Sequence, residues 1–143
     1  MVNREFDAEQ FVAAAGDAII AADAEGLIVF WNAAAERIFG YTKSEALHNP
    51  LDLIIPERLR NRHWEGYRKV MQSGRTRYGS EVLRVPAVHK DGRDLSIAFT
   101  VTLILAPDGH VRSVVAIIRD ETKRWQEERA LRQRLAALTE KTT

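Results

Sequence analysis

Hydrophobic and polar positions alternate most regularly between Asp94 and Leu105. Every second residue of this segment is apolar: Leu95, Ile97, Phe99, Val101 and Leu103. Successive side chains of a β-strand point to opposite faces, so the pattern predicts a strand with one buried face. Further strands are expected at 81–89, which Pro86 confines to an edge, a bulge or a strand end, and at 111–119. The links between the three contain Asp-Gly and are short, which favours antiparallel pairing.

Two compact apolar runs, 18–22 and 27–31, come earlier in the chain. The segment between them is Asp-Ala-Glu-Gly, and Gly26 at its end suits a tight reversal, so the two runs are expected to form a β-hairpin. A strand pair, then helices, then three strands would make an α+β fold. The pattern therefore predicts a five-stranded antiparallel sheet with helices on one face.

Helix signals lie between these two groups of strands. Asn32 can cap the N-terminus of a short helix, and Gly40 can end it. Thr42 and Glu45 have the spacing of a capping box, so a second short helix is expected after them.

A longer helix is predicted from about residue 57 to residue 73, since Pro56 suits its first turn and Gly74 its end. One stripe of this helix is formed by four residues spaced 4, 4 and 3 apart: Leu59, His63, Tyr67 and Val70. The opposite face carries charges that can form ion pairs within the helix and is expected to be solvated.

The two ends of the chain are expected to be helical. We expect an N-terminal cap helix over residues 1–16 and the central domain over residues 17–121. A C-terminal signalling or dimerisation helix is expected over residues 122–143. Leu131, Leu135 and Leu138 are spaced 4 and 3 apart in this last helix. They favour either a short parallel coiled coil with a second chain or packing of the helix back on its own domain.

Composition narrows the possible functions. The chain has 143 residues, enough for one domain, and its 21 basic and 20 acidic residues argue against nucleic-acid and membrane partners. It contains no cysteine, which excludes disulfides, thiolate metal ligands and a flavin–cysteinyl adduct. No apolar run is long enough to span a bilayer and no secretory signal is present, so a cytoplasmic protein is expected. No nucleotide-binding, metalloprotease or serine-hydrolase motif is found, and an enzyme is not expected.

His63 is the residue with the most informative chemistry. It lies on an apolar stripe, where an imidazole needs a hydrogen-bond partner, and the neighbouring side chains offer only the hydroxyl of Tyr67. Either it is a satisfied core histidine, or its neutral ring faces a cavity as an axial ligand of haem iron would. The other histidines, His48, His89 and His110, lie beside turn residues and are expected on the surface.

Several segments resemble a PAS sensor domain. They are Asp-Ala-Ile-Ile at 17–20, Asp-Ala-Glu-Gly at 23–26, Trp-Asn-Ala-Ala-Ala-Glu-Arg-Ile-Phe-Gly-Tyr at 31–41, Lys-Asp-Gly at 90–92 and Ile-Arg-Asp-Glu-Thr at 118–122. The resemblance covers about residues 8–122. It implies helices that enclose a ligand cavity against the five-stranded sheet. It also implies a C-terminal helix that passes a signal to a downstream effector domain, a partner protein or the other subunit of a homodimer.

Within this family, Ile-Pro-Glu-Arg-Leu-Arg-Asn-Arg-His at 55–63 resembles the haem-bearing helix of oxygen-sensing PAS domains. The resemblance implies that His63 is the axial ligand of haem b and that the bound gas is O2, CO or NO. Arg84 resembles the distal arginine of the sensor kinases, but it and Tyr67 each come one residue late. If the register is truly lost, Leu83 lines the distal side instead.

The expected cofactor site combines both lines of reasoning. Its proposed residues are Leu59, His63, Tyr67, Val70, Leu83, Arg84, Ile97, Phe99, Ala116 and Ile118. Two alternatives remain open: a haem-free module for dimerisation and signal relay, or a domain that binds a small metabolite or noncovalent FAD. The absorption spectrum of the purified protein would distinguish these possibilities.

Overall fold

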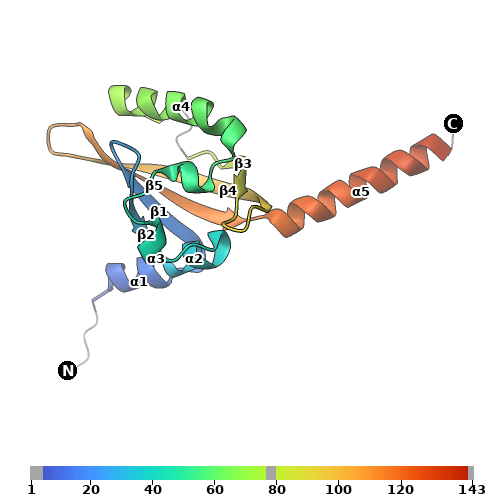
Figure 1. Cartoon of the computed structure of the whole chain (residues 1–143), viewed down its shortest axis with the longest axis horizontal. Helices are drawn as coiled ribbons and strands as arrows, with labels where there is room; N and C mark the ends of the chain where they lie inside the picture. The colour runs from blue at the N-terminus through green and yellow to red at the C-terminus, as the bar shows by residue number, and fades with distance from the viewer. Residues whose placement is uncertain (1–4, 77–79, 142–143) are drawn as a thin grey trace.

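The computed structural model describes residues 5–76 and 80–141, which form a sheet, a group of helices and a projecting C-terminal helix (Figure 1). The elements are, in chain order, α1 (Ala8–Ala14), β1 (Ala18–Asp23), β2 (Ile28–Trp31), α2 (Ala33–Phe39), α3 (Lys43–Ala46), the 3₁₀ turns η1 (Leu51–Ile54) and η2 (Glu57–Leu59), α4 (Arg60–Ser73), β3 (Leu83–Val88), β4 (Asp94–Leu105), β5 (Val111–Asp120) and α5 (Thr122–Lys141). The five strands expected from the sequence are present. The long helix begins at Arg60 because its first three expected residues form the tighter turn η2.

All strands form one antiparallel sheet in the order β2-β1-β5-β4-β3. The last strand, β5, therefore lies in the centre, between the first hairpin and the β3–β4 pair. Pro86 lies on β3, an edge strand, where a missing N–H does not interrupt a ladder on both sides. This confirms the predicted α+β fold.

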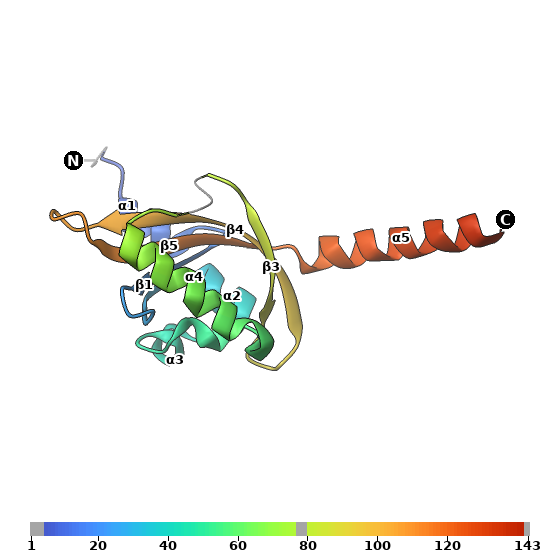
Figure 2. The same cartoon turned by 90° about the horizontal axis from the view of Figure 1, so that it is seen from above.

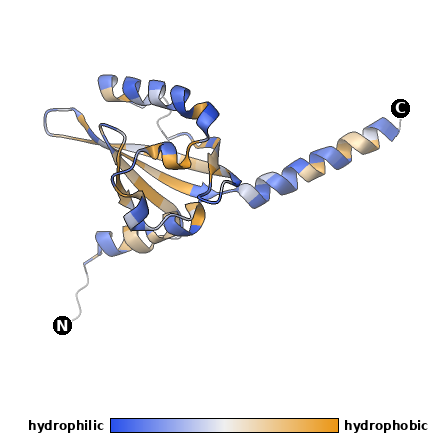
Figure 3. Ribbon diagram, viewed as in Figure 1, coloured by the Kyte–Doolittle hydropathy of each residue, from blue (hydrophilic) through white to orange (hydrophobic). Residues whose placement is uncertain are grey.

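The helices α2, α3 and α4 gather on one side of the strands (Figure 2). Apolar residues are frequent along the strands (Figure 3). Trp31, Phe39 and Ile28 are the largest fully buried side chains. The core lies between the sheet and the turns that connect β2 to α4, because residues of α2, α3 and η1 belong to the same buried cluster as residues of all five strands.

Full burial of the predicted inner face of β4 is confined to the first half of the strand. Leu95 and Ile97 are buried, whereas Phe99, Val101 and Leu103 are half-buried. Figure 1 shows the reason, since the β4–β5 hairpin continues past the helical layer.

Asn32 joins the N-terminal segment to the sheet. Its Oδ1 accepts hydrogen bonds from the backbone N–H groups of Ile19 and Ala35, each at 3.0 Å. Its Nδ2 donates to the carbonyl oxygens of Val12 and Asp17. The predicted N-cap of α2 is therefore confirmed, and the same buried amide satisfies three further backbone groups.

The C-terminal helix α5 extends away from the domain (Figures 1 and 2). Leu131, Leu135 and Leu138 are 58%, 64% and 61% exposed, so this helix does not pack back on its own domain. Among the described helices, none combines the length and the apolar character that crossing a membrane requires.

Candidate functional site around His63

The first turn of α4 is held by an arginine and not by a side-chain N-cap. Arg60 donates from Nε to the carbonyl oxygen of Ile55 at 3.1 Å and from Nη2 to that of Asp52 at 3.3 Å. Gly74 ends the helix in the left-handed conformation, as predicted. These contacts fix the direction in which α4 leaves η1 and η2.

His63 lies one turn into α4 and is half-buried. Among the buried side-chain nitrogen and oxygen atoms of the described residues, its Nδ1 is the one that has no hydrogen-bond partner. Burial lowers the pKa of this imidazole, and the nearby carboxylate of Asp52 opposes that shift only in part. The ring is therefore held in its neutral form, with a lone pair or an N–H that no protein atom uses.

The hydroxyl of Tyr67 does not satisfy His63, although it was the partner expected from the sequence. It donates instead to the carbonyl oxygen of Asp23, at the end of β1. Burial raises the pKa of Tyr67, and the carboxylates of Asp23 and Glu25 add to the effect, so the hydroxyl stays a donor. The two rings still meet, with centroids 5.8 Å apart.

Trp64, which sequence reasoning did not assign, is the other neighbour of His63. Their ring centroids are 4.7 Å apart in an edge-to-face arrangement. The indole Nε1 donates to Oδ1 of Asp52 at 2.7 Å. The ring also covers Gly26, where any Cβ would collide with it. The only sign of this contact in the sequence was the glycine at position 26. The hairpin turn, in which Gly26 has a positive φ, already explained that glycine.

The inner face of the sheet brings together most of the other expected site residues. Cross-strand partners share a face, and the register places Leu83 opposite Phe99, Phe99 opposite Ile118 and Val101 opposite Ala116. The buried cluster includes Ile97 and Ile118, and Phe99 and Ala116 pack against it. On α4, Leu59 and Val70 are half-buried.

Arg84 is not brought to this face. It pairs with Ala98 on the opposite side of the sheet, is 62% exposed, and its Nε lies 3.4 Å from Oε2 of Glu121. Since side chains alternate along a strand, Leu83 occupies the inward position. The expectation that Arg84 faces the cavity side is therefore corrected: of the two registers considered, the structure has the one that places Leu83 on the inner face.

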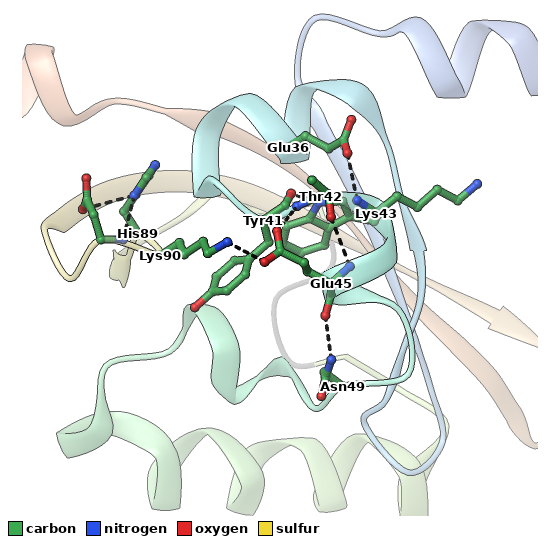
Figure 4. Close-up of polar contacts among 10 residues, drawn as sticks. Glu36, Tyr41, Thr42, Lys43, Glu45, Asn49, His89 and Lys90 are labelled. Carbon is green, nitrogen blue, oxygen red and sulfur yellow. Dashed lines mark hydrogen bonds and ion pairs between the residues drawn. The ribbon is translucent and has the colours of Figure 1, made fainter.

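The turn between α2 and α3 docks on the β3–β4 hairpin (Figure 4). Thr42 and Glu45 form the predicted capping box, and Lys90 pairs with Glu45 beside the ring of Tyr41. His89 is only 13% exposed and its ring fills the place of a Cβ on Gly40, so the expected surface position is wrong for this histidine. It accepts a hydrogen bond from the backbone of Asp91. His48 and His110 are exposed, as expected.

A shallow hollow lies between α4 and the β1–β2 turn. Its lining consists of Ala24, Glu25, Trp64, Tyr67, Arg68, Met71 and Gln72. No group of three or more metal-ligating side chains occurs in residues 5–76 and 80–141.

Comparison with known proteins places this geometry in a family. The family model for the PAS fold matches residues 7–120. A protein from Azorhizobium caulinodans is 36% identical over 121 residues, which are 84% of this chain and 16% of that protein. The oxygen sensor protein DosP of Escherichia coli is 29% identical over 111 residues, which are 78% of this chain and 14% of DosP. The chain thus spans less than a fifth of the length of either relative.

The fold agrees with these matches. The crystal structure of the PAS domain of a protein from Colwellia psychrerythraea superimposes with a TM-score of 0.70 and is 23% identical, over 80% of this chain and 94% of that domain. The motifs at 17–41 and 90–92 and all five strands of the sheet lie within the matched range, and the motif at 118–122 overlaps its end. By its sequence and by its fold, the chain belongs to the PAS family of sensor domains.

Proposed function

We propose that this PAS domain binds haem b with His63 as the axial ligand and senses a diatomic gas, O2, CO or NO. The observation that carries the proposal is the buried, partnerless Nδ1 of a neutral imidazole. An unsatisfied polar atom of this kind costs about 1–3 kcal/mol. A bound group that uses the ring would remove part of this cost. The relation to DosP, an oxygen sensor, supports the same function.

The chemistry of His63 and of the apolar residues on the inner face of the sheet is compatible with such a group. Neutral imidazole is the form that ligates iron, and burial favours it here. The apolar face of the sheet would contact the macrocycle and exclude water, through Leu83, Ile97, Phe99, Ala116 and Ile118. Haem iron would supply the position at which the gas binds. On β3 the inward side chain next to Arg84 is the aliphatic Leu83.

The sheet is connected to α5 by a short polar junction. The backbone N–H of Glu121 donates to the carbonyl oxygen of Ser96, and the Ser96 N–H donates to Oγ1 of Thr122. Asp120 accepts from the backbone N–H of Thr122 at the start of the helix. A shift of β4 or β5 would therefore move the first turn of α5.

In this proposal α5 carries the signal to a second copy of the chain and to an effector domain or partner protein. The exposed leucines Leu131 and Leu135 would form the seam of the homodimer. The chain senses and relays, and it carries out no reaction of its own.

Haem reconstitution of the purified protein tests the function. We expect a Soret band that His63→Ala abolishes or reduces to loosely held haem. His110→Ala is the matched control, because His110 is 82% exposed and lies on the β4–β5 turn. A flavin spectrum would assign the alternative cofactor. A protein that stays colourless after haem titration, or an unchanged haem spectrum in His63→Ala, would refute haem binding through His63.

A further inference from the structure

We propose that Trp64 is a positioning residue for His63 and that its contacts with Asp52 and Gly26, here called the Trp64 clamp, set the position of α4. The clamp concerns the protein fold directly. Its effect on a bound cofactor rests on the proposed function.

Both contacts of the indole are specific. Its Nε1 donates to Oδ1 of Asp52 at 2.7 Å, and its six-membered ring covers Gly26 so closely that no other residue fits there. Gly26 also has φ +83°, which an L side chain rarely adopts. The indole is thus held both at its edge and on its face.

The two contact points of the clamp belong to one unit. The backbone N–H of Leu51 donates to the carbonyl oxygen of Gly26, so the β1–β2 turn is tied to η1, which contains Asp52. The carbonyl oxygen of Asp52 accepts from Arg60 at the start of α4. The turn, η1 and α4 are therefore joined around Trp64, and a displacement of the indole would be felt in all three.

Little else fixes the middle of α4. Of its 14 residues only Tyr67 is buried, and its hydroxyl is bonded to Asp23 of the same turn. The rings of Trp64 and Tyr67 are 5.3 Å apart. The helix is thus held at two places, 64 and 67, on one side of the β1–β2 hairpin.

His63 lies beside both of these contacts. Its ring meets those of Trp64 and Tyr67 at centroid distances of 4.7 and 5.8 Å. Because Trp64 is the next residue along the chain, rotation of α4 after loss of the clamp would move His63 with it. The clamp therefore determines whether the imidazole is held in one orientation.

Four variants separate the contacts. Trp64→Phe removes the donor but keeps an aromatic side chain at this position, and Asp52→Ala removes the acceptor. Asp52→Asn keeps an acceptor oxygen and serves as the rescue. Trp125→Phe is the control for loss of an indole, because Trp125 lies on α5 and is 47% exposed.

Two measurements follow on the full chain. The first is hydrogen–deuterium exchange of the α4 amides in the haem-free protein, with β5 as the internal reference. The second is the rate at which reconstituted haem transfers to excess apomyoglobin, together with the absorption spectrum that reports axial ligation.

We expect Trp64→Phe and Asp52→Ala to speed α4 exchange and haem transfer at least tenfold and to alter the ligation spectrum. Asp52→Asn and Trp125→Phe should stay within about threefold of the wild type. If α4 exchange and haem transfer are unchanged in Trp64→Phe and Asp52→Ala while His63→Ala abolishes haem binding, the clamp is refuted and the proposed function stands. If neither the wild type nor any variant binds haem but α4 exchange rises as described, the proposed function fails and the clamp stands.

Discussion

Arg84 on β3 pairs with Glu121 at the start of α5, with 3.4 Å between Nε and Oε2. Glu121 also lies 3.8 Å from Arg124 on the first turn of the helix. The arginine that resembles a gas-contacting residue is thus connected to the start of α5 on the outer face of the sheet. The pair is exposed at Arg84, so its contribution to stability is expected to be below about 1 kcal/mol.

This pairing predicts a separation of effects. Arg84→Ala should leave the gas dissociation rate of the haem-loaded protein within twofold of the wild type, because the side chain lies on the opposite face from the core. It should increase amide exchange at 121–125. Leu83→Arg, which adds a donor at the inward position, should change the gas dissociation rate. A tenfold faster gas loss in Arg84→Ala would contradict the observed register.

Phe39 and Phe99 offer a comparison of one residue type at two depths. Phe39 is fully buried, whereas Phe99 is half-buried at the rim of the core. Phe39→Ala should lower the free energy of unfolding by about 3–5 kcal/mol. Phe99→Ala should cost roughly half as much in the haem-free protein. Urea denaturation of the two variants measures the difference, and equal losses would show that Phe99 is as well packed as Phe39.

The buried amide of Asn32 is expected to be important for stability. Asn32→Ala removes the cap of α2 and leaves the backbone groups of Ile19, Val12 and Asp17 without this partner. The loss should be roughly 2–4 kcal/mol, from the cap and the unsatisfied buried groups together. Asn61→Ala, at an exposed position, should stay within about 0.5 kcal/mol in the same thermal or urea unfolding experiment. A loss below about 1 kcal/mol for Asn32→Ala would mean that water replaces the amide.

Tyr67 gives the protein a distinct response to alkaline pH. Burial raises its pKa above the usual value of about 10 in the folded state, so the unfolded chain releases this proton first. The stability that Tyr67 contributes is fully present below pH 10 and is lost as pH rises through the folded-state pKa. The advantage of wild type over Tyr67→Phe should therefore shrink between about pH 10 and 11.5. Urea unfolding of both proteins across this range measures it, and a constant difference would contradict the buried hydroxyl.

The exposed seam of α5 predicts the state of association. Replacing Leu131 and Leu135 by lysine should turn a dimer into a monomer in light scattering, because two charges would enter the proposed coiled-coil interface. Ala130→Lys with Ala136→Lys is the matched control, since these positions lie off the 4-3 stripe. Truncation after residue 121 should also give a monomer. If light scattering gives the seam variant and the control variant the same molar mass in solution, the proposed seam is wrong.

Local signals in the sequence were sufficient for the elements. The alternation from Leu95 to Leu103, the capping residues Asn32 and Thr42 and the stops at Gly40 and Gly74 act within a few residues, so their effects can be seen without the rest of the chain. The inward stripe of α4 was partly visible in the same way, because a helical period places His63 and Tyr67 on one face.

Tertiary structure decided the contacts between distant segments. The central position of β5 depends on which strands meet, and the local pattern of each strand is compatible with several orders. A one-residue shift in β3 exchanges Leu83 and Arg84 between faces, and only the pairing with β4 settles which one is inward. The bond from Trp64 to Asp52 and the one from Tyr67 to Asp23 join residues 12 and 44 positions apart. Such pairs leave no period in the sequence, so the buried, unpaired Nδ1 of His63 could be recognised only after the chain had folded.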